Sequence, residues 1–421
     1  MINPRSLDHP KLRPLVVNRV DQNGRTCAVL DDPLGVAQGS VTISWDGFCK
    51  VVRHFNGDHS LSTIQSLVLE ETGQYLAIDE LAKLVDRLDR SMHLDGPTFA
   101  SFLQAYRAEP IRPPAHAGGA YAGDAASLSD QLDRFFQDPR GAGRPSPYAP
   151  PNGARSVRAI LGPHIDFHRG GHIYTWPYRD LVERSDAEIF VVLGVAHQYC
   201  KNRFALTYKH FDTPLGLVRT DLDYVRRIVD RTGDQYLDDE PAHRTEHSIE
   251  FQAVFLRYLL GDTRPFRIVP ILVGSFHDLV RARIDPMTDP EIARFVAALR
   301  DVERESAAKV AYIGGIDLGH IGREFGDPDL LDQESLDRLR IFDASMLDRA
   351  IAGDAEGWFR IAAEVDNRHR ICGLAATYTL LQTIGPAKGR ILKYDQAVNA
   401  ARTCCVSFAG VVLETESNSK T

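Results

Sequence analysis

The histidines of this 421-residue chain are unevenly distributed, since nine of the 15 lie between His164 and His320. Four strand-like apolar runs are each followed, after a glycine, by a histidine: His164, His197, His277 and His320. Imidazole nitrogens bind zinc, iron, copper and nickel, and several imidazoles at one sheet edge can hold a single ion. We therefore expect a metal or catalytic site there, to which His277 fits least well. The alternative is that each histidine only hydrogen-bonds its own loop.

A second histidine pair lies in the segment His243-Arg-Thr-Glu-His247, which precedes an apolar stretch. It matches the H-x-x-E-H pattern of inverted zinc proteases, in which both histidines bind zinc from one helical face and Glu246 is the general base. A second interpretation is that Glu246 and Glu250 stabilise the start of a helix. In a third, His247 is an acid or base that faces a metal held by the strand-end histidines. The residues alone leave all three open.

Polar residues near these histidines are candidates for substrate binding. Asp166 and Arg169 closely follow His164, and His243 belongs to the H-x-x-E-H segment. A guanidinium group can clamp a carboxylate or phosphate group through paired hydrogen bonds. The alternative for Asp166 and Arg169 is a surface turn with solvated charges.

The cysteines and several absent motifs narrow the chemistry further. Six scattered cysteines do not form a disulfide framework, so a reducing cytoplasm is expected. Cys372 could be a reactive thiol, although a small buried residue is the commoner role. Cys404 and Cys405 would point to opposite faces of a strand and cannot share a metal. The sequence contains no Walker A, no Gly-x-Ser-x-Gly and no Gly-x-Gly-x-x-Gly after a strand, which disfavours nucleotide-dependent and serine-hydrolase chemistry.

Composition excludes several classes of protein. Lys and Arg total 49 against 57 Asp and Glu, a net charge of −8, whereas proteins that bind duplex nucleic acid usually carry a basic excess. The 43% hydrophobic content and mixed charges argue against disorder. The longest apolar runs are strand-length, and the first residues form no apolar signal segment. We expect a cytoplasmic protein of two or three domains that binds neither nucleic acid nor membrane.

The elements that would position the histidines form an alternating series from residue 157 onward. Strand-like runs cover residues 157–161, 188–193, 204–207, 267–273, 309–313 and 404–412, with helical patterns at 174–184, 222–232, 249–260, 290–300, 337–352 and 375–383. This alternation predicts an α/β domain with a mostly parallel sheet flanked by helices. Ligands of such sheets bind beyond the carboxyl ends of the strands, where the histidines fall.

Residues 1–105 are predicted to form a separate small module. A strand near residues 41–48 precedes a helix capped by Ser60 or Ser62 and another capped by Asp79, an order that suggests a winged-helix-like unit. Its many acidic residues disfavour DNA binding. A proline-rich linker at residues 110–114 leads to the second domain, at 115–415.

Several segments of the second domain occur in the order found in the Memo family. They include Gly162-Pro-His164, Gly194-Val-Ala-His197, Glu246-His-Ser-Ile-Glu250 and Asp317-Leu-Gly-His320. Over residues 115–413 the chain resembles this family, including the bacterial branch known as AmmeMemoRadiSam system protein B. The resemblance implies the fold of class III extradiol dioxygenases, which use non-haem iron.

The resemblance also implies roles for individual residues. His164 and His197 match the metal-binding histidines, and His247 matches the histidine that faces the metal. The third family ligand, a cysteine in eukaryotic members, falls at Gly319 here. His320 and Asp317 are the nearby replacements, of which His320 is preferred on ligand chemistry. The implied cofactor is a divalent metal ion, with iron expected first and copper or zinc as alternatives.

The leading hypothesis is therefore a dioxygenase-like, metal-dependent oxidoreductase that acts on a small-molecule or peptide substrate. His247 and Glu246 would handle protons, and the substrate would contact Asp166, Arg169 and His243. The rival hypotheses are a zinc-dependent hydrolase that uses the H-x-x-E-H segment and a non-catalytic scaffold that binds a peptide. The N-terminal module resembles, more loosely, winged-helix domains that bind peptides in peptide-modifying pathways, which implies a protein partner.

Overall fold

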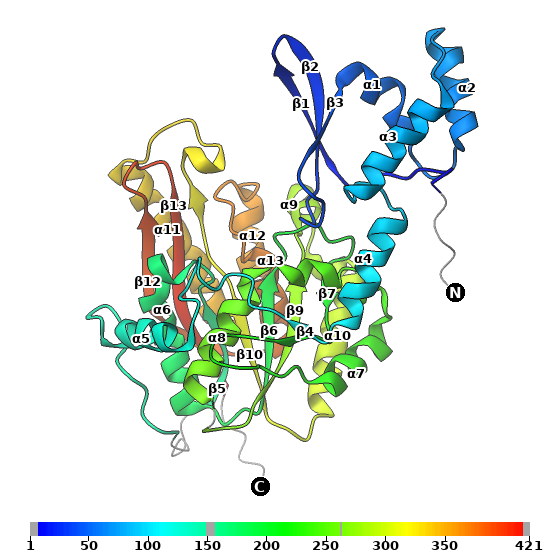
Figure 1. Ribbon diagram of the computed structural model, residues 1–421. Coiled ribbons are helices and arrows are strands. Elements are labelled where there is room, and N and C mark those ends of the chain that lie inside the picture. The colour runs from blue at the N-terminus through cyan, green and yellow to red at the C-terminus, as the bar shows by residue number, and fades with distance from the viewer. Residues whose placement is uncertain (1–6, 149–155, 262, 416–421) are drawn as a thin grey trace. The chain divides into compact units, whose positions relative to one another are not determined.

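The computed structural model describes residues 7–148, 156–261 and 263–415. The chain divides into two compact units, Met1–Glu109 and Pro110–Thr421 (Figure 1). The division falls where the proline-rich stretch begins.

The first unit combines a three-stranded antiparallel sheet with four helices. The strands are β1 (Val16–Gln22), β2 (Arg25–Asp31) and β3 (Val41–Ser44), and the helices are α1 (Trp45–Lys50), α2 (Leu61–Thr72), α3 (Ile78–Arg90) and α4 (Pro97–Ala108). Asn23 and Gly24 join β1 to β2 with φ of 52° and 76°, as a two-residue hairpin turn requires. Ser60 caps α2 as predicted, but Ala77, and not Asp79, precedes α3. The winged-helix assignment stays a prediction.

The second unit is built on an eight-stranded mixed sheet. Along the sheet the strands are β11 (His320–Ile321), β13 (Cys405–Thr415), β5 (Ser156–Gly162), β10 (Val310–Gly315), β6 (Ile189–Val195), β9 (Arg267–Val273) and β7 (Phe204–Leu206), with β12 (Lys388–Val398) paired to β13. Only β5, β10, β6 and β9 pair in parallel. The predicted parallel pairing is therefore confirmed for these four central strands, but the sheet as a whole is mixed. The difference arises because β12 and β13 form a long antiparallel hairpin that pairs with β5.

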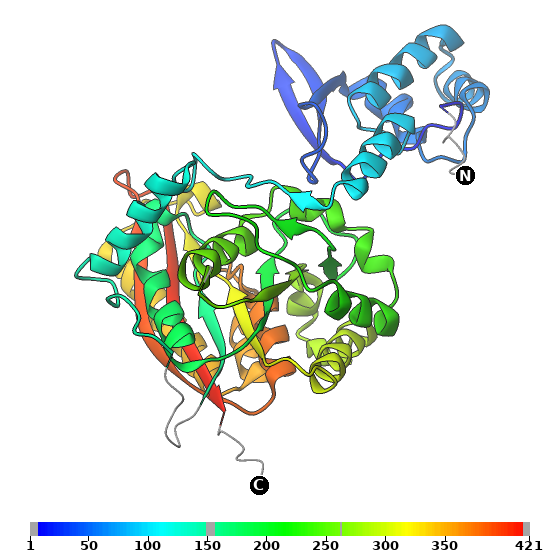
Figure 2. The ribbon, with the colours of Figure 1, turned by 60° about the horizontal axis from the view of Figure 1, so that its bottom comes forward.

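Helices cover both faces of this sheet (Figures 1 and 2). On one face lie α6 (Phe167–Arg184) and α8 (His247–Leu260), which meet through stacked rings of Tyr174 and Phe255, 4.7 Å between centroids. On the other face the strands share a core with α7 (Leu222–Thr232), α10 (Pro290–Arg304), α11 (Gln333–Ile351), α12 (Ala355–Glu364) and α13 (Leu374–Ile384). None of the helices in the described part of the chain is both long and apolar enough to cross a membrane.

Shorter elements complete the second unit. They are β4 (Ile111–Arg112), which pairs with β8 (His210–Phe211), α5 (Ala125–Gln137), α9 (His277–Ala282) and the 3₁₀ turn η3 (Glu240–Arg244). The positions of β6, β9, β10, α7 and α13 agree with the sequence prediction to within two residues, since each has a continuous apolar pattern.

Two glycines allow α8 to lie directly on the sheet. A Cβ atom at Gly194 of β6 would be 2.5 Å from the Ser248 Oγ, and one at Gly315 of β10 would be 2.3 Å from the Ser248 carbonyl oxygen. Ser248 Oγ also accepts a hydrogen bond from the backbone N–H of Val195, at 3.0 Å. Because both strands lack a side chain at the contact, the first residue of α8 is brought to the carboxyl ends of β6 and β10.

A buried ion pair fixes the start of α8 from the other side. Arg112 and Glu250 lie 2.6 Å apart, and neither side chain is more than 1% exposed. Arg112 also donates hydrogen bonds to the carbonyl oxygens of His243 and Glu246, at 2.6 and 2.8 Å. Burial alone would raise the pKa of Glu250, but the hydrogen bond from His116 and the charge of Arg112 lower it to about 2. The segment before α8 is thus held in one conformation.

Asp343, on α11, is a buried acid beside β12. Its Oδ2 accepts a hydrogen bond from the Tyr394 hydroxyl at 2.8 Å, whereas its Oδ1 has no hydrogen-bond partner among the described residues. Burial raises the pKa of Asp343 from its ordinary value of 3.8 to about 7. The folded chain therefore keeps a proton that the unfolded chain releases between pH 4 and pH 7.

Asp343→Asn is expected to stabilise the protein at pH 8 and not at pH 4. Between these values the folded state binds more protons than the unfolded state, so this residue makes the free energy of unfolding fall as pH rises. Asparagine removes the charge, and we expect a gain of about 1–3 kcal/mol at pH 8, measured by urea denaturation. Asp337→Asn, an exposed position of the same helix, is the control. An equal gain at both pH values would show that Asp343 does not titrate in this range.

Candidate metal site

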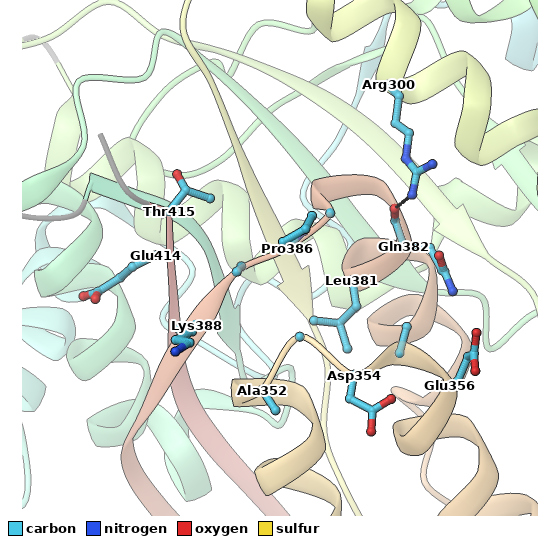
Figure 3. Close-up of a pocket in the computed structure, with 14 residues that line it drawn as sticks. Arg300, Ala352, Asp354, Glu356, Leu381, Gln382, Pro386, Lys388, Glu414 and Thr415 are labelled. Carbon is cyan, nitrogen blue, oxygen red and sulfur yellow. Dashed lines mark hydrogen bonds between the residues drawn. The ribbon is translucent and has the colours of Figure 1, made fainter. Parts of the chain in front are cut away.

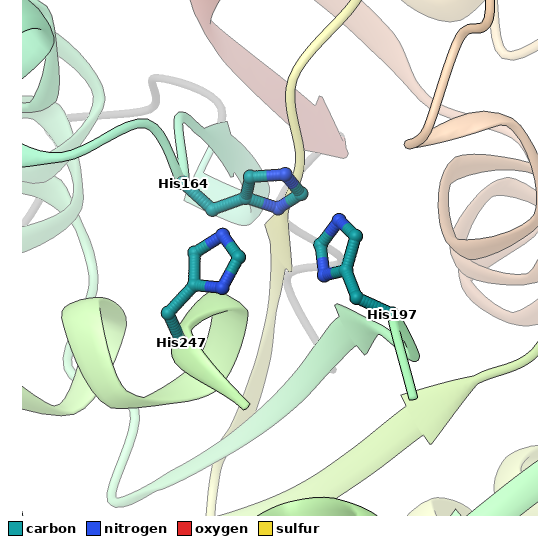
Figure 4. A group of neighbouring side chains, drawn as sticks. All are labelled: His164, His197 and His247. Atoms are coloured by element: carbon teal, nitrogen blue, oxygen red, sulfur yellow. The ribbon is translucent and has the colours of Figure 1, made fainter. Parts of the chain in front are cut away.

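Three histidines converge at the carboxyl ends of neighbouring parallel strands (Figure 4). His164 lies two residues after β5, His197 lies two residues after β6, and His247 is the first residue of α8. The ring centroids are 4.8 to 5.1 Å apart, and one potential ligand atom of each ring lies within 4.8 Å of those of the other two. This is the one such group of three or more His, Cys, Asp or Glu side chains within residues 7–148, 156–261 and 263–415, and it could hold a metal ion.

Hydrogen bonds fix the protonation of two of the rings. His164 Nδ1 lies 2.9 Å from the carbonyl oxygen of Gly315, which can only accept, so Nδ1 carries the proton. His197 Nδ1 lies 3.0 and 3.1 Å from the two carboxylate oxygens of Glu246 and donates to them. In both rings Nε2 is left with the lone pair that metal binding requires.

The protein environment also keeps the rings of His164 and His247 neutral. Burial lowers the pKa of His164 to about 3, and burial together with the neighbouring His164 lowers that of His247 to about 3. Burial acts in the same direction on His197, but its hydrogen bond to Glu246 raises the pKa above the ordinary value. His164 and His247 are therefore in the metal-binding form at neutral pH.

Glu246 connects two of the histidines to the helix that carries one of them. It is the N-cap of α8, and its carboxylate accepts hydrogen bonds from the backbone N–H groups of His197, His247 and Ser248, at 2.8 to 3.0 Å. The Nδ1 of His247 lies 3.2 Å from the same carboxylate. Burial would raise the pKa of Glu246, but His197 and His247 hold it well below its usual range. Since both oxygens are engaged inside the protein, the geometry favours a positioning role over proton transfer.

The H-x-x-E-H interpretation is wrong, because α8 begins only at His247. His243 lies in η3, before the helix, and the two histidines are not on one helical face. The His243 ring is buried, and its Nε2 donates to the Ala205 carbonyl oxygen at 3.1 Å. Contact of His243 with a substrate remains a prediction.

Asp317 and His320 follow β10, the strand between β5 and β6, but they are placed differently. Asp317 is buried, accepts a hydrogen bond from the backbone N–H of His164 at 3.0 Å, and has its Oδ2 3.7 Å from His164 Nε2. Burial raises the pKa of Asp317 to about 6. His320 donates from Nδ1 to the carbonyl oxygens of Leu318 and Arg370, both at 3.1 Å, and is outside the three-histidine group. The geometry thus favours Asp317 as the further metal ligand, whereas the sequence prediction preferred His320.

The other predicted residues lie nearer the surface. Asp166 caps α6, and its carboxylate pairs with the half-exposed Arg169 at 2.6 Å. His277 is exposed at the start of α9 and is not part of the group. Contact of Asp166 and Arg169 with a substrate remains a prediction.

Gly319, where the family cysteine was expected, has no room for a side chain directed at the histidines. A Cβ atom there would lie 2.4 Å from Leu339 Cδ1 and 3.3 Å from Ser407 Oγ, so it would point toward α11 and β13.

Two side chains that lie beside the group were not predicted to do so. The His116 ring lies 5.6 Å from that of His247, and its Nδ1 contacts Glu250 at 3.1 Å. Cys372, considered mainly as a buried small residue, has its Sγ 3.3 Å from His164 Nε2. Neither follows a predicted strand of the parallel centre, so the rule that located His164 and His197 could not find them.

The group is accessible from one side. His164 is almost fully buried, whereas the side chains of His197 and His247 are 35% and 30% exposed. An ion and a small ligand could therefore approach along these two rings, while His164 closes the inner side.

A pocket lies near the amino-terminal end of β5, opposite the end that precedes His164. It has a volume of about 960 Å³ and is lined by the ends of α13 and β13, including Gln382 and Thr415 (Figure 3). Thr415 pairs with Ser156, the first residue of β5, whereas His164 follows the last. No histidine lines this pocket, so it is separate from the metal site.

Comparison with known proteins shows to which family the chain belongs. The family model described as Memo-like protein matches residues 112–412. A MEMO1 family protein of Aquifex aeolicus is 26% identical over 392 residues, which cover 91% of this chain and 95% of the relative. A MEMO1 family protein of Methanopyrus kandleri is 28% identical over 310 residues, 72% of this chain and 98% of the relative. The match to Aquifex reaches into the first unit, because it exceeds the length of the second. The chain belongs to the Memo family.

Proposed function

We propose that this protein binds a divalent metal ion through His164, His197 and His247 and acts as a non-haem metal oxidoreductase on a small-molecule or peptide substrate. The observation that carries the proposal is the convergence of three imidazoles, two of which have their proton on Nδ1 and a lone pair on Nε2. Imidazole suits iron, copper and zinc, and the carboxylate of Asp317 beside His164 favours iron.

A bound iron ion would supply the one-electron and O₂ chemistry that side chains lack. The residues around it hold and orient the donors. Glu246 keeps the Nδ1 proton on His197 and fixes the start of α8, and the Gly315 carbonyl does the same for His164. The exposed edges of His197 and His247 leave an approach for substrate, and Arg169 is the proposed anchor for an anionic substrate group.

His247 is proposed as a ligand, because its relation to Glu246 parallels that of His197. Each ring has Nδ1 about 3 Å from this carboxylate, and the two rings stack with their centroids 4.8 Å apart. A proton carrier would instead need to face the substrate with a pKa near the working pH, and burial keeps that of His247 at about 3.

The His164→Ala and His197→Ala variants are expected to lose metal binding. Each removes one imidazole from the group, so affinity for Zn²⁺ or Fe²⁺ should fall by more than about 100-fold. This exceeds the loss of about 10–100-fold that is typical when only a residue hydrogen-bonded to a metal ligand is changed. Metal content after anaerobic purification and a competition titration with a chelator give the measurement. His277→Ala, another strand-end histidine, should bind metal like the unaltered protein. Unchanged affinity in both site variants would refute the proposal.

Glu246→Gln is expected to weaken metal binding while the chain remains folded. Glutamine has one acceptor oxygen instead of two and no charge, so it cannot accept all the hydrogen bonds that Glu246 receives, and the imidazoles lose part of their orientation and basicity. Changes of this kind typically cost about 10–100-fold in metal affinity, measured by the same titration. Asp124→Asn, at the acidic N-cap of α5, is the matched control. Full affinity in Glu246→Gln would show that this carboxylate does not position the ligands.

A further inference from the structure

A groove beside α11 brings together two apolar side chains that are exposed to solvent. Its volume is about 720 Å³, and Ile341 and Leu330, which line it, are 71% and 51% exposed. Among the large hydrophobic side chains of the described residues, Tyr75 alone is also more than half exposed. Single exposed apolar residues are common on protein surfaces, whereas a cluster of them at a hollow is typical of a binding site.

Hydrogen bonds hold the groove in shape. The backbone N–H of Leu331 donates to the Arg402 carbonyl oxygen at 2.9 Å, and that of His320 donates to the His369 carbonyl oxygen at 2.7 Å. Because these bonds fix the two loops that lie opposite α11 in the lining, the groove is formed before a ligand arrives. The lining comes from α11, residues 327–331, residues 368–369 and Ile321.

Arg368 places a positive charge beside the apolar part of the groove. Its Nε donates to His369 Nε2 at 3.4 Å, and the His369 ring lies 4.5 Å from that of Phe342 on α11, between centroids. Arg368 forms no ion pair with an acidic side chain in the described part of the chain. Its guanidinium group is therefore available to an anionic ligand.

The other charged side chains of the groove are already paired, except Asp329. Asp327 forms an ion pair with Arg370 at 2.7 Å, and Arg338 forms one with Glu334. Asp329 is exposed, so its carboxylate can stay hydrated when the groove is filled. The pairing leaves Arg368 as the charge that lies next to apolar rings.

We propose that this groove binds a small organic anion with an apolar body, such as an aryl or branched alkyl carboxylate. The body would lie against Ile341, Leu330 and Phe342, and the carboxylate would accept paired hydrogen bonds from Arg368, whose planar guanidinium fits such a group. The volume is within the range of about 300–1,000 Å³ that is typical of small-molecule pockets. The site is separate from the three-histidine group, because none of the side chains that line it belongs to that group.

Titration of the full-length protein with 4-phenylbutyrate, followed by calorimetry or ligand-detected NMR, tests the proposal. We expect a Kd below about 1 mM. The amine 4-phenylbutylamine has the same apolar body with a cation in place of the anion, and it should bind at least about tenfold more weakly, because it cannot accept hydrogen bonds from Arg368. Equal or tighter binding of the amine, or no binding of the carboxylate, would overturn the proposal.

Two variants show whether the carboxylate binds in this groove. Arg368→Gln should weaken the binding of 4-phenylbutyrate by at least about fivefold, since a charged hydrogen bond is lost, and Ile341→Ser by at least about threefold, since apolar contact is lost. Asp329→Asn should not weaken it. Ile391→Ser, at a partly exposed isoleucine of β12, is the matched control. Unchanged affinity in both Arg368→Gln and Ile341→Ser would place the ligand elsewhere and contradict the assignment.

Sedimentation velocity distinguishes a small ligand from a second copy of the chain as the occupant of the groove. The unaltered protein and Ile341→Ser should have the same oligomeric state. A dimer that forms in the unaltered protein and dissociates in Ile341→Ser would show that a second copy covers the groove, and the proposal would then be wrong. These measurements use no metal ion, so their outcome is independent of the proposed metal site.

Discussion

The carboxylate of Glu246 is the group on which the arrangement of the site depends. It caps α8, accepts hydrogen bonds from the backbone N–H groups of His197, His247 and Ser248, and accepts another from Nδ1 of His197. A negative charge at a helix N-terminus is favourable, and it compensates here for the cost of burying the carboxylate. One side chain therefore joins the loop after β6 to the first turn of α8 and sets the direction of two imidazoles. The Arg112–Glu250 ion pair stabilises this arrangement, because Arg112 also donates a hydrogen bond to the Glu246 carbonyl oxygen.

The remaining donors are placed by the sheet. His164, Asp317 and His197 each lie two residues beyond the end of a parallel strand, and β10 lies between β5 and β6. The regular spacing of parallel strands therefore sets these three side chains side by side. Gly194 and Gly315 then bring α8 close enough for His247 to join them. The outcome is a donor set that is buried at His164 and open at His197.

Ligands of α/β sheets bind beyond the carboxyl ends of the strands, and this rule was enough to predict two of the three histidines and the edge of the sheet where they meet. The rule did not extend to His320, because the chain turns after Asp317 into β11, which pairs with β13, and His320 lies outside the three-histidine group. The H-x-x-E-H pattern misled because it presumes a helix through residue 243, whereas the cap at Glu246 starts the helix later. Other features depend on packing: Cys372 is 208 residues from His164 in sequence, and no spacing predicts their contact. In contrast, the Asn23-Gly24 hairpin of the first unit carries a turn signal that sequence reasoning could have used.

The central claim is that three imidazoles share one metal ion at this edge of the sheet. X-ray absorption at the zinc edge of the zinc-loaded, full-length protein tests it most directly, because imidazole rings give a characteristic multiple-scattering pattern. The structure predicts three imidazole nitrogens at about 2.0–2.1 Å. A zinc shell made of oxygen donors, or one with a single imidazole, would contradict the claim.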